Sequence, residues 1–138
     1  MYSSEGKLLW YRSQNFGNKV RLRKAIPWIL NIEEDVNYLI IEGGGPLRKI
    51  WDAHLEKRNI EVFHIMAEDW RKDILLEREQ RKGKKAKEKA IAYAEKVIDK
   101  LSEKKSGTVN DDAAEAILIG LWGCIQQGWI NNHDAILR

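Results

Sequence analysis

The chain has 138 residues, of which 43 % are apolar, and its 24 Lys and Arg against 21 Asp and Glu give a net charge of +3. This length suits a single domain with one substantial core, and a lone cysteine, Cys124, excludes an internal disulfide. No apolar run approaches the ~20 residues of a membrane-spanning helix, and the amino terminus lacks the pattern of a signal peptide. We therefore expect one domain over residues 1–138, located in the cytoplasm and without a membrane partner.

The charge is distributed unevenly along the chain. Residues 71–105 contain 13 of the 24 Lys and Arg and 7 acids, a local charge of +6, so the remainder carries −3. A basic segment in an otherwise slightly acidic domain favours a polyanionic partner. A solvated loop and helix start is the alternative for its densest part, from Arg78 to Lys89.

The first part of the chain predicts a hairpin, a helix and a buried strand. Residues 1–16 suit a hairpin with its turn at 4–7 and a return strand at 8–11. Asn18 can cap a helix over residues 19–26, which Pro27 must kink or restart before it ends near residues 33–35. Residues 38–42 run without polar alternation through Leu39, Ile40 and Ile41, as in a strand covered on both faces.

The remaining segments alternate helix, strand and helices. Three glycines at 43–45 precede Pro46, and because the nucleotide-binding loop pattern is absent, a plain connection is favoured over a phosphate loop. A helix is expected over 47–58, a strand over 60–66, a short helix from Ala67 and a helix over 84–102. The last helix is expected within residues 108–123, and residues 128–134 show no clear periodicity.

Three carboxylates stand out. Asp112 and Glu115 are three residues apart at the start of the last predicted helix, which places them on one face. Two such acids suit either a divalent cation or the positive amino end of the helix itself. Glu42 ends an apolar strand, and the carboxyl ends of strands are where open α/β sheets place their ligand sites, which favours the cation.

Cysteine and histidine offer no comparable signal. Cys124 lies inside an apolar helical run, which indicates a small buried hydrophobe rather than a nucleophile. His54, His64 and His133 have no metal-ligand spacing, so structural or surface roles are favoured.

Four motifs in this order resemble those of one known superfamily. They are Ile40-Ile41-Glu42-Gly43, Ala67-Glu68-Asp69-Trp70-Arg71, Lys84-Lys85-Ala86-Lys87-Glu88 and Asp112-Ala113-Ala114-Glu115-Ala116. The set resembles the RNase H-like superfamily, most closely the RuvC-type Holliday junction resolvases and their uncharacterised relatives. The resemblance implies an α/β, three-layer fold in which a mixed sheet is flanked by helices.

The resemblance also implies an activity and its residues. In that family four carboxylates bind two Mg²⁺ (or Mn²⁺) ions that drive phosphodiester hydrolysis in branched DNA, and the enzymes act as homodimers. By position, Glu42 matches the second acid, Asp112 the third and Glu115 the fourth, which is usually Asp in RuvC itself. The three are therefore candidate catalytic and metal-binding residues. The nucleic-acid contacts implied are those of the basic segment: Arg81, Lys82, Lys84, Lys85, Lys87 and Lys89.

One departure from the family leaves the function open. The family begins with a central strand carrying the first aspartate, whereas this sequence starts inside what matches the second strand. A start codon assigned too far downstream, a partner chain that completes the sheet and a degenerate protein that binds without cutting are three explanations. The sequence thus predicts a RuvC-like endonuclease, with a non-catalytic nucleic-acid-binding or assembly module as the alternative. An interaction protein with no nucleic-acid role is a third possibility.

Overall fold

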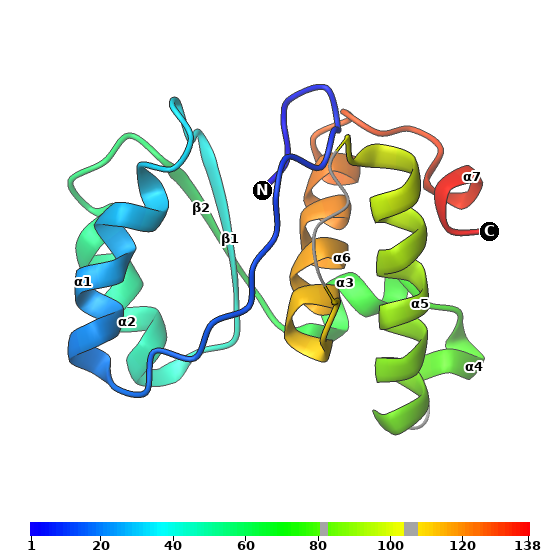
Figure 1. Cartoon of the computed structure of the whole chain (residues 1–138), viewed down its shortest axis with the longest axis horizontal. Helices are drawn as coiled ribbons and strands as arrows, with labels where there is room; N and C mark the ends of the chain where they lie inside the picture. The colour runs from blue at the N-terminus through cyan, green and yellow to red at the C-terminus, as the bar shows by residue number, and fades with distance from the viewer. Residues whose placement is uncertain (81–82, 104–107) are drawn as a thin grey trace. The chain divides into compact units, whose positions relative to one another are not determined.

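The structure is a computed structural model that describes residues 1–80, 83–103 and 108–138 (Figure 1). The chain divides into two compact units. Gln14–Ala67 form the smaller, α/β unit, and Met1–Ser13 together with Glu68–Arg138 form a helical unit. The predicted α/β class is confirmed, while the single-domain organisation stays a prediction.

The α/β unit contains two helices and a two-stranded parallel sheet. Its elements are α1 (Lys19–Leu30), β1 (Tyr38–Glu42), α2 (Gly45–Leu55) and β2 (Glu61–Ile65). The strands pair from Tyr38 opposite Glu61 to Glu42 opposite Ile65, and α2 is the crossover that a parallel pair requires. Both strands and both helices were predicted, although α1 continues through Pro27 to Leu30 and α2 begins at Gly45 and ends at Leu55.

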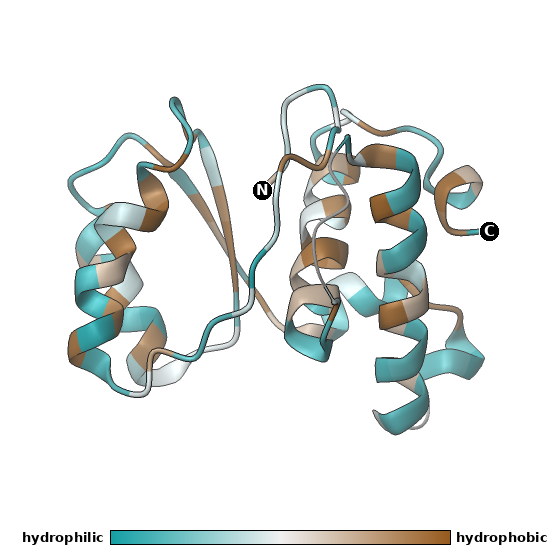
Figure 2. Ribbon diagram, viewed as in Figure 1, coloured by the Kyte–Doolittle hydropathy of each residue, from teal (hydrophilic) through white to brown (hydrophobic). Residues whose placement is uncertain are grey.

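The core of this unit lies between the helices and one face of the sheet, where Figure 2 shows apolar segments of the helices and strands. Its buried members come from α1 and α2: Leu22, Ile26, Leu30, Ile50 and Leu55. Leu39 and Ile41 of β1 and Val62 of β2 pack against them. Because side chains alternate along a strand, Glu42 projects from the opposite face to Leu39 and Ile41.

The helical unit is built around its two longest helices. It contains α3 (Ala67–Ile74), α4 (Glu77–Gln80), α5 (Gly83–Leu101), α6 (Asp111–Gln126) and α7 (His133–Leu137). α5 packs against α4, α6 and α7. Fully buried apolar side chains come from α3, α5, α6 and α7, including Trp70, Val97, Leu118 and Leu137. The apolar spacing that predicted α5 and α6 therefore marks the faces that meet in this core.

The predicted hairpin over residues 1–16 is confirmed at its turn but is much shorter than expected, since the Ser3 amide donates to the Lys7 carbonyl at 2.9 Å and the Leu9 amide to the Met1 carbonyl at 3.1 Å. Tyr2 and Leu8 form a single antiparallel bridge, and Leu8 then forms a parallel bridge with Ser102. The Leu8 amide donates to the carbonyl of Leu101 at 3.0 Å. The pairing does not extend beyond Leu9, so the predicted return strand over residues 8–11 is reduced to the bridge at Leu8.

Tyr2 anchors this segment on α6. Its hydroxyl donates to the carbonyl oxygen of Ile117 at 2.8 Å, and its ring lies against Gly120, where a Cβ would be 2.4 Å from Cε2. Burial raises the pKa of Tyr2 well above its usual value. The absence of a side chain at Gly120 therefore makes room for the ring of Tyr2.

Two further expectations differ from the structure. The expected mixed sheet is wrong for the described part of the chain, where the sheet contains two parallel strands. The three-layer RNase H-like arrangement stays a prediction. The aperiodic tail ends in α7, whose cap is the Asn132 side chain accepting from the Ala135 amide at 3.1 Å. No helix among the described residues has the length and hydrophobicity needed to cross a bilayer.

Candidate functional site

The amino end of α6 carries two of the three predicted carboxylates. Asn110 caps the helix, since its side chain accepts from the Ala113 amide at 2.9 Å. Asp111 pairs with Lys87 of α5 at 3.2 Å. Asp112 is exposed and has no hydrogen-bond or ion-pair partner among the described residues. Both interpretations of this acidic turn thus keep some support, because Asn110 satisfies the helix end and Asp112 remains available.

Glu115 has a protein partner. The guanidinium of Arg71 donates to its carboxylate at 2.7 Å, and both side chains are mostly buried, at 32 % and 22 % exposure. Arg71 also lies over the ring of Trp70, at 5.3 Å from the ring centroid. The arginine therefore supplies to Glu115 the positive charge that the sequence led us to expect from a metal ion, and it makes no such contact with Asp112. Sequence reasoning included Arg71 in a motif but missed its contact with Glu115, 44 residues away.

Glu42 belongs to the other unit. It is the last residue of β1 and is half-buried at the carboxyl end of the parallel pair, as predicted. Neither unit by itself brings all three carboxylates together, because Asp112 and Glu115 lie in the helical unit. Within residues 1–80, 83–103 and 108–138, no group of three or more His, Cys, Asp or Glu is placed to hold a metal ion. The predicted Mg²⁺ or Mn²⁺ site therefore stays a prediction.

The basic segment divides into paired and unpaired lysines. Arg81 and Lys82 lie outside the described residues. Lys84 and Lys85 are exposed on the first turn of α5 and have no partner in the described part of the chain. Lys87 pairs with Asp111 as above, and the Lys89 ammonium lies 3.4 Å from Oε1 of Glu79. Of the four described lysines, Lys84 and Lys85 are thus the ones free to meet a ligand.

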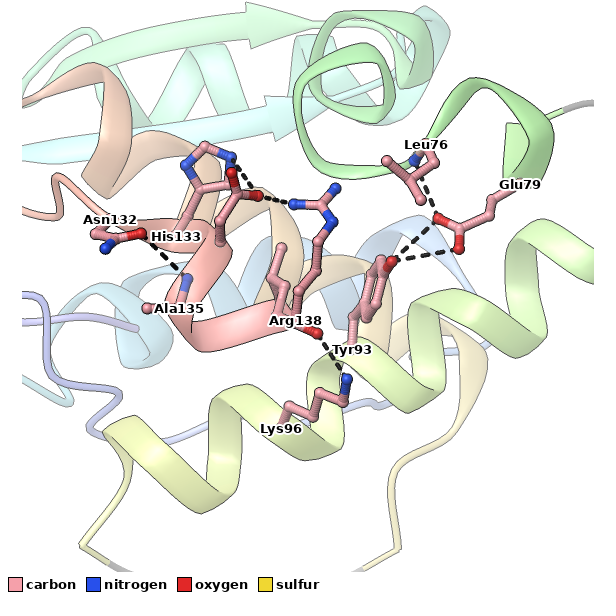
Figure 3. A network of polar contacts seen from close by, with 10 residues as sticks. Leu76, Glu79, Tyr93, Lys96, Asn132, His133, Ala135 and Arg138 are labelled. Carbon is pink, nitrogen blue, oxygen red and sulfur yellow. Dashed lines mark hydrogen bonds and ion pairs between the residues drawn. The ribbon is translucent and has the colours of Figure 1, made fainter.

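Glu79 is a buried acid that sequence reasoning missed. Only 6 % of it is exposed, and it accepts from the Leu76 amide at 3.0 Å and from the Tyr93 hydroxyl at 3.1 Å (Figure 3). Burial alone would raise the pKa of Glu79, but these hydrogen bonds and the Lys89 charge lower it. Burial and the bond to Glu79 raise the pKa of Tyr93. The cluster fastens α4 to α5 and is structural.

Neighbouring polar contacts tie α7 to α5. The Lys96 ammonium donates to the carbonyl oxygen of Leu137 at 2.7 Å, and Arg138 pairs with Asp134 (Figure 3).

His64 of β2 pairs with Asp52 of α2 in the α/β unit. Its Nε2 lies 3.0 Å from Oδ1 of Asp52, and its Nδ1 is buried without a hydrogen-bond partner in the described part of the chain. These contacts join elements of the same unit.

Cys124 behaves as the sequence predicts. It is a buried free thiol on α6, and burial raises its pKa to about 11. A thiol with that pKa is almost wholly protonated at neutral pH, and the thiolate is the nucleophilic form. Nucleophilic cysteine chemistry is therefore not part of the candidate site.

Comparison with known proteins does not assign this chain to a family. No protein family matches the chain, and no match was found among curated proteins or solved structures. The resemblance to RuvC-type resolvases therefore depends on the four sequence motifs alone.

Proposed function

We propose that this protein binds nucleic acid through the amino-terminal turn of α5. The observation that supports the proposal is the pair of exposed cations Lys84 and Lys85, which have no acidic partner among the described residues. They lie within residues 78–89, where seven Lys and Arg accompany two acids. Unpaired cations on a helix surface neutralise phosphates and release counterions, which is the main source of sequence-independent affinity.

The experiment that tests this proposal measures binding against salt concentration. Labelled single-stranded, duplex and four-way-junction DNA are titrated with the wild type and with the K84A/K85A variant, and fluorescence anisotropy is recorded. Loss of two phosphate contacts should reduce the slope of log K against log salt by about 1.8 on duplex DNA. The K57A/K72A variant is a matched control, since Lys57 and Lys72 are also exposed and unpartnered among the described residues. Equal slopes for the two variants, or no binding by the wild type, would refute the proposal.

A second candidate function is metal-dependent cleavage of branched DNA by a RuvC-like endonuclease. Two observations favour it: Asp112 is an exposed carboxylate without a partner among the described residues, and Glu42 ends a parallel strand. When bound, Mg²⁺ or Mn²⁺ would supply water activation and stabilisation of the leaving oxygen. The candidate ligands are Glu42, Asp112 and Glu115, although Glu115 would first have to exchange its bond to Arg71. The homodimer and the cytoplasmic location stay predictions of the sequence.

Cleavage assays separate the two functions. If the protein is a nuclease, the Asp112→Asn and Glu115→Gln variants should lose Mg²⁺-dependent cleavage of a junction while they retain DNA binding and a native circular dichroism spectrum. Retained cleavage by either variant would defeat the assignment of that residue. Binding without cleavage by the wild type, in Mg²⁺ and in Mn²⁺, would favour the non-catalytic module.

A further inference from the structure

A groove between α1 and α2 is lined by three Lys and Arg side chains, one histidine and three apolar residues. Lys19 and Arg23 of α1 and Lys49 and His54 of α2 surround a hollow of about 350 Å³, with Ile50 and Ala53 also in its lining. None of the described residues that line it is acidic. We call this surface the basic groove. It lies wholly within the α/β unit, whereas α5 belongs to the helical unit.

The charges of the basic groove are not compensated within the structure. Lys19, Arg23 and Lys49 are exposed, and none has an ion-pair or hydrogen-bond partner among the described residues. Arg48, next to Lys49, points to Asp52 instead and pairs with it at 3.7 Å. Residues 14–67 contain eight Lys and Arg and seven acids, so three uncompensated cations in one groove are a local concentration of charge. An anion placed there would relieve their mutual repulsion.

The spacing of these cations suits a chain of phosphates better than a single ion. Lys19 and Arg23 are four residues apart, so their backbones are separated by about 6 Å along α1. Lys49 approaches from the other helix, and the packing of α1 on α2 fixes the distance between the two sides. Arginine can bind a phosphate through two parallel hydrogen bonds, while lysine acts as a point charge. Pro46 and Ala53, which are exposed and also line the groove, offer an apolar contact to sugar carbons between the phosphates.

We propose that the basic groove binds the sugar–phosphate backbone of a nucleic-acid strand, as a second contact in addition to Lys84 and Lys85. This inference rests on the proposed nucleic-acid function. A strand is favoured over a membrane because the cations line a hollow between two helices, which a backbone can enter and a planar bilayer surface cannot. Backbone contacts of this kind give affinity without sequence specificity.

The test compares three variants of the full chain on the same labelled DNA. The groove variant is K19A/R23A/K49A, and its matched control is R21A/K24A/K57A, which removes three exposed cations of the same unit that do not line the groove. The third variant is K84A/K85A. Raising the salt from 50 to 200 mM weakens the binding of both proteins to duplex DNA. Because the groove variant has three phosphate contacts fewer, its fold-decrease in affinity should be about 40 times smaller than that of the wild type. The control should follow the wild type.

The outcomes separate this inference from the proposed function. If the wild type binds, K84A/K85A weakens binding and the groove variant matches its control, the basic groove inference is wrong and the proposed function stands. If the groove variant alone weakens binding, the groove is the nucleic-acid site and the assignment to α5 is wrong. If the wild type binds no DNA or RNA, both are refuted. Binding to phosphatidylserine vesicles that the groove variant loses, with DNA binding unchanged, would assign the groove to a membrane and overturn the inference.

Folding controls keep the test decisive. The three cations are exposed and unpartnered in the described structure, so their removal should leave the thermal melting curve unchanged. If the triple variant nevertheless melts early, the single variants Arg23→Gln and Lys49→Gln replace it. Each should reduce the salt slope by about 0.9, and an unchanged slope in both would refute the inference.

Discussion

Truncation of Glu79 should destabilise the helical unit strongly, because it removes a buried hydrogen-bond acceptor. The carboxylate is 6 % exposed and accepts from the Leu76 amide at 3.0 Å and from the Tyr93 hydroxyl at 3.1 Å. Glu79→Ala leaves both donors without an acceptor, at about 1 to 2 kcal/mol each. The Lys89 ammonium adds little, because 47 % of its side chain is exposed and water screens it. We expect the free energy of unfolding to fall by about 3 kcal/mol.

Urea unfolding followed by far-UV circular dichroism measures this loss. A decrease of about 3 kcal/mol corresponds to a melting temperature lower by roughly 10 °C for a chain of this size. The matched control is Glu88→Ala, because Glu88 is exposed on α5 and has no partner among the described residues. It should change stability by less than about 0.5 kcal/mol. Tyr93→Phe, which removes one donor, should cost about 1 kcal/mol, and much less in a Glu79→Ala background.

The pH dependence of this difference follows from the direction of the pKa shift. Burial would raise the pKa of Glu79, but the bonds from Leu76 and Tyr93 and the Lys89 charge lower it below 4.5. The unfolded chain therefore binds the proton more readily, so the stabilisation is present above pH about 4.5 and is lost as the pH falls through the folded pKa. The gap between wild type and Glu79→Ala should narrow on acidification. A gap that stays constant into the acid range, or a Glu79→Ala variant as stable as Glu88→Ala, would refute this account of the cluster.

Three further predictions test α6. Gly120→Ala should lower the free energy of unfolding by about 1 to 3 kcal/mol, because its Cβ would lie 2.4 Å from Cε2 of Tyr2. In a Tyr2→Ala background the same change should instead raise the free energy of unfolding, because Ala favours a helix more than Gly does. Urea unfolding of the four proteins distinguishes the two signs. Arg71→Ala should cost about 1 to 2 kcal/mol by leaving the half-buried Glu115 unpaired, and Arg71→Ala/Glu115→Ala should recover part of that loss; additive costs would show that the pair contributes nothing. Cys124, with its pKa raised to about 11, should react with a thiol reagent at neutral pH only after unfolding, so fast labelling of the native protein would contradict its burial.

Periodicity and capping residues predicted most elements, because these signals are local. Asn18 is the predicted cap of α1, and its side chain accepts from the Arg21 amide at 2.9 Å. The apolar runs at 38–42 and 60–66 became the two strands of the parallel pair. Local signals misplaced the end of α1, which continues through Pro27 between the buried Ile26 and Leu30 and stops at Leu30 rather than near residues 33–35. Tertiary packing there outweighs the missing amide hydrogen bond.

The candidate site could be predicted only in part, because its decisive contacts join residues far apart in the chain. Helical spacing places Asp112 and Glu115 on one face, yet it cannot show that Arg71 pairs with Glu115 while Asp112 has no partner among the described residues. Glu79 looked like one acid in a charged run, and its burial depends on Tyr93, fourteen residues later. The spacing of residues within a helix determines which side chains share a face. It does not determine which distant residues contact that face.

The same limit applies to the positive charge from which nucleic-acid binding was first inferred. The net charge of +6 over residues 71–105 counts Arg71, Lys87 and Lys89, which the structure pairs with Glu115, Asp111 and Glu79. A paired cation must give up its carboxylate before it can bind a phosphate, so it contributes less to affinity than a free one.

Cations without a partner are therefore the better guide to a binding surface than net charge. By that criterion Lys84 and Lys85 remain on α5. The net charge of residues 14–67 is close to zero and did not indicate a binding surface. In the structure, however, Lys19, Arg23 and Lys49 line one groove of this unit without partners among the described residues. A salt titration of the two sets of variants measures which of these surfaces neutralises phosphates, because the slope counts the contacts that are lost.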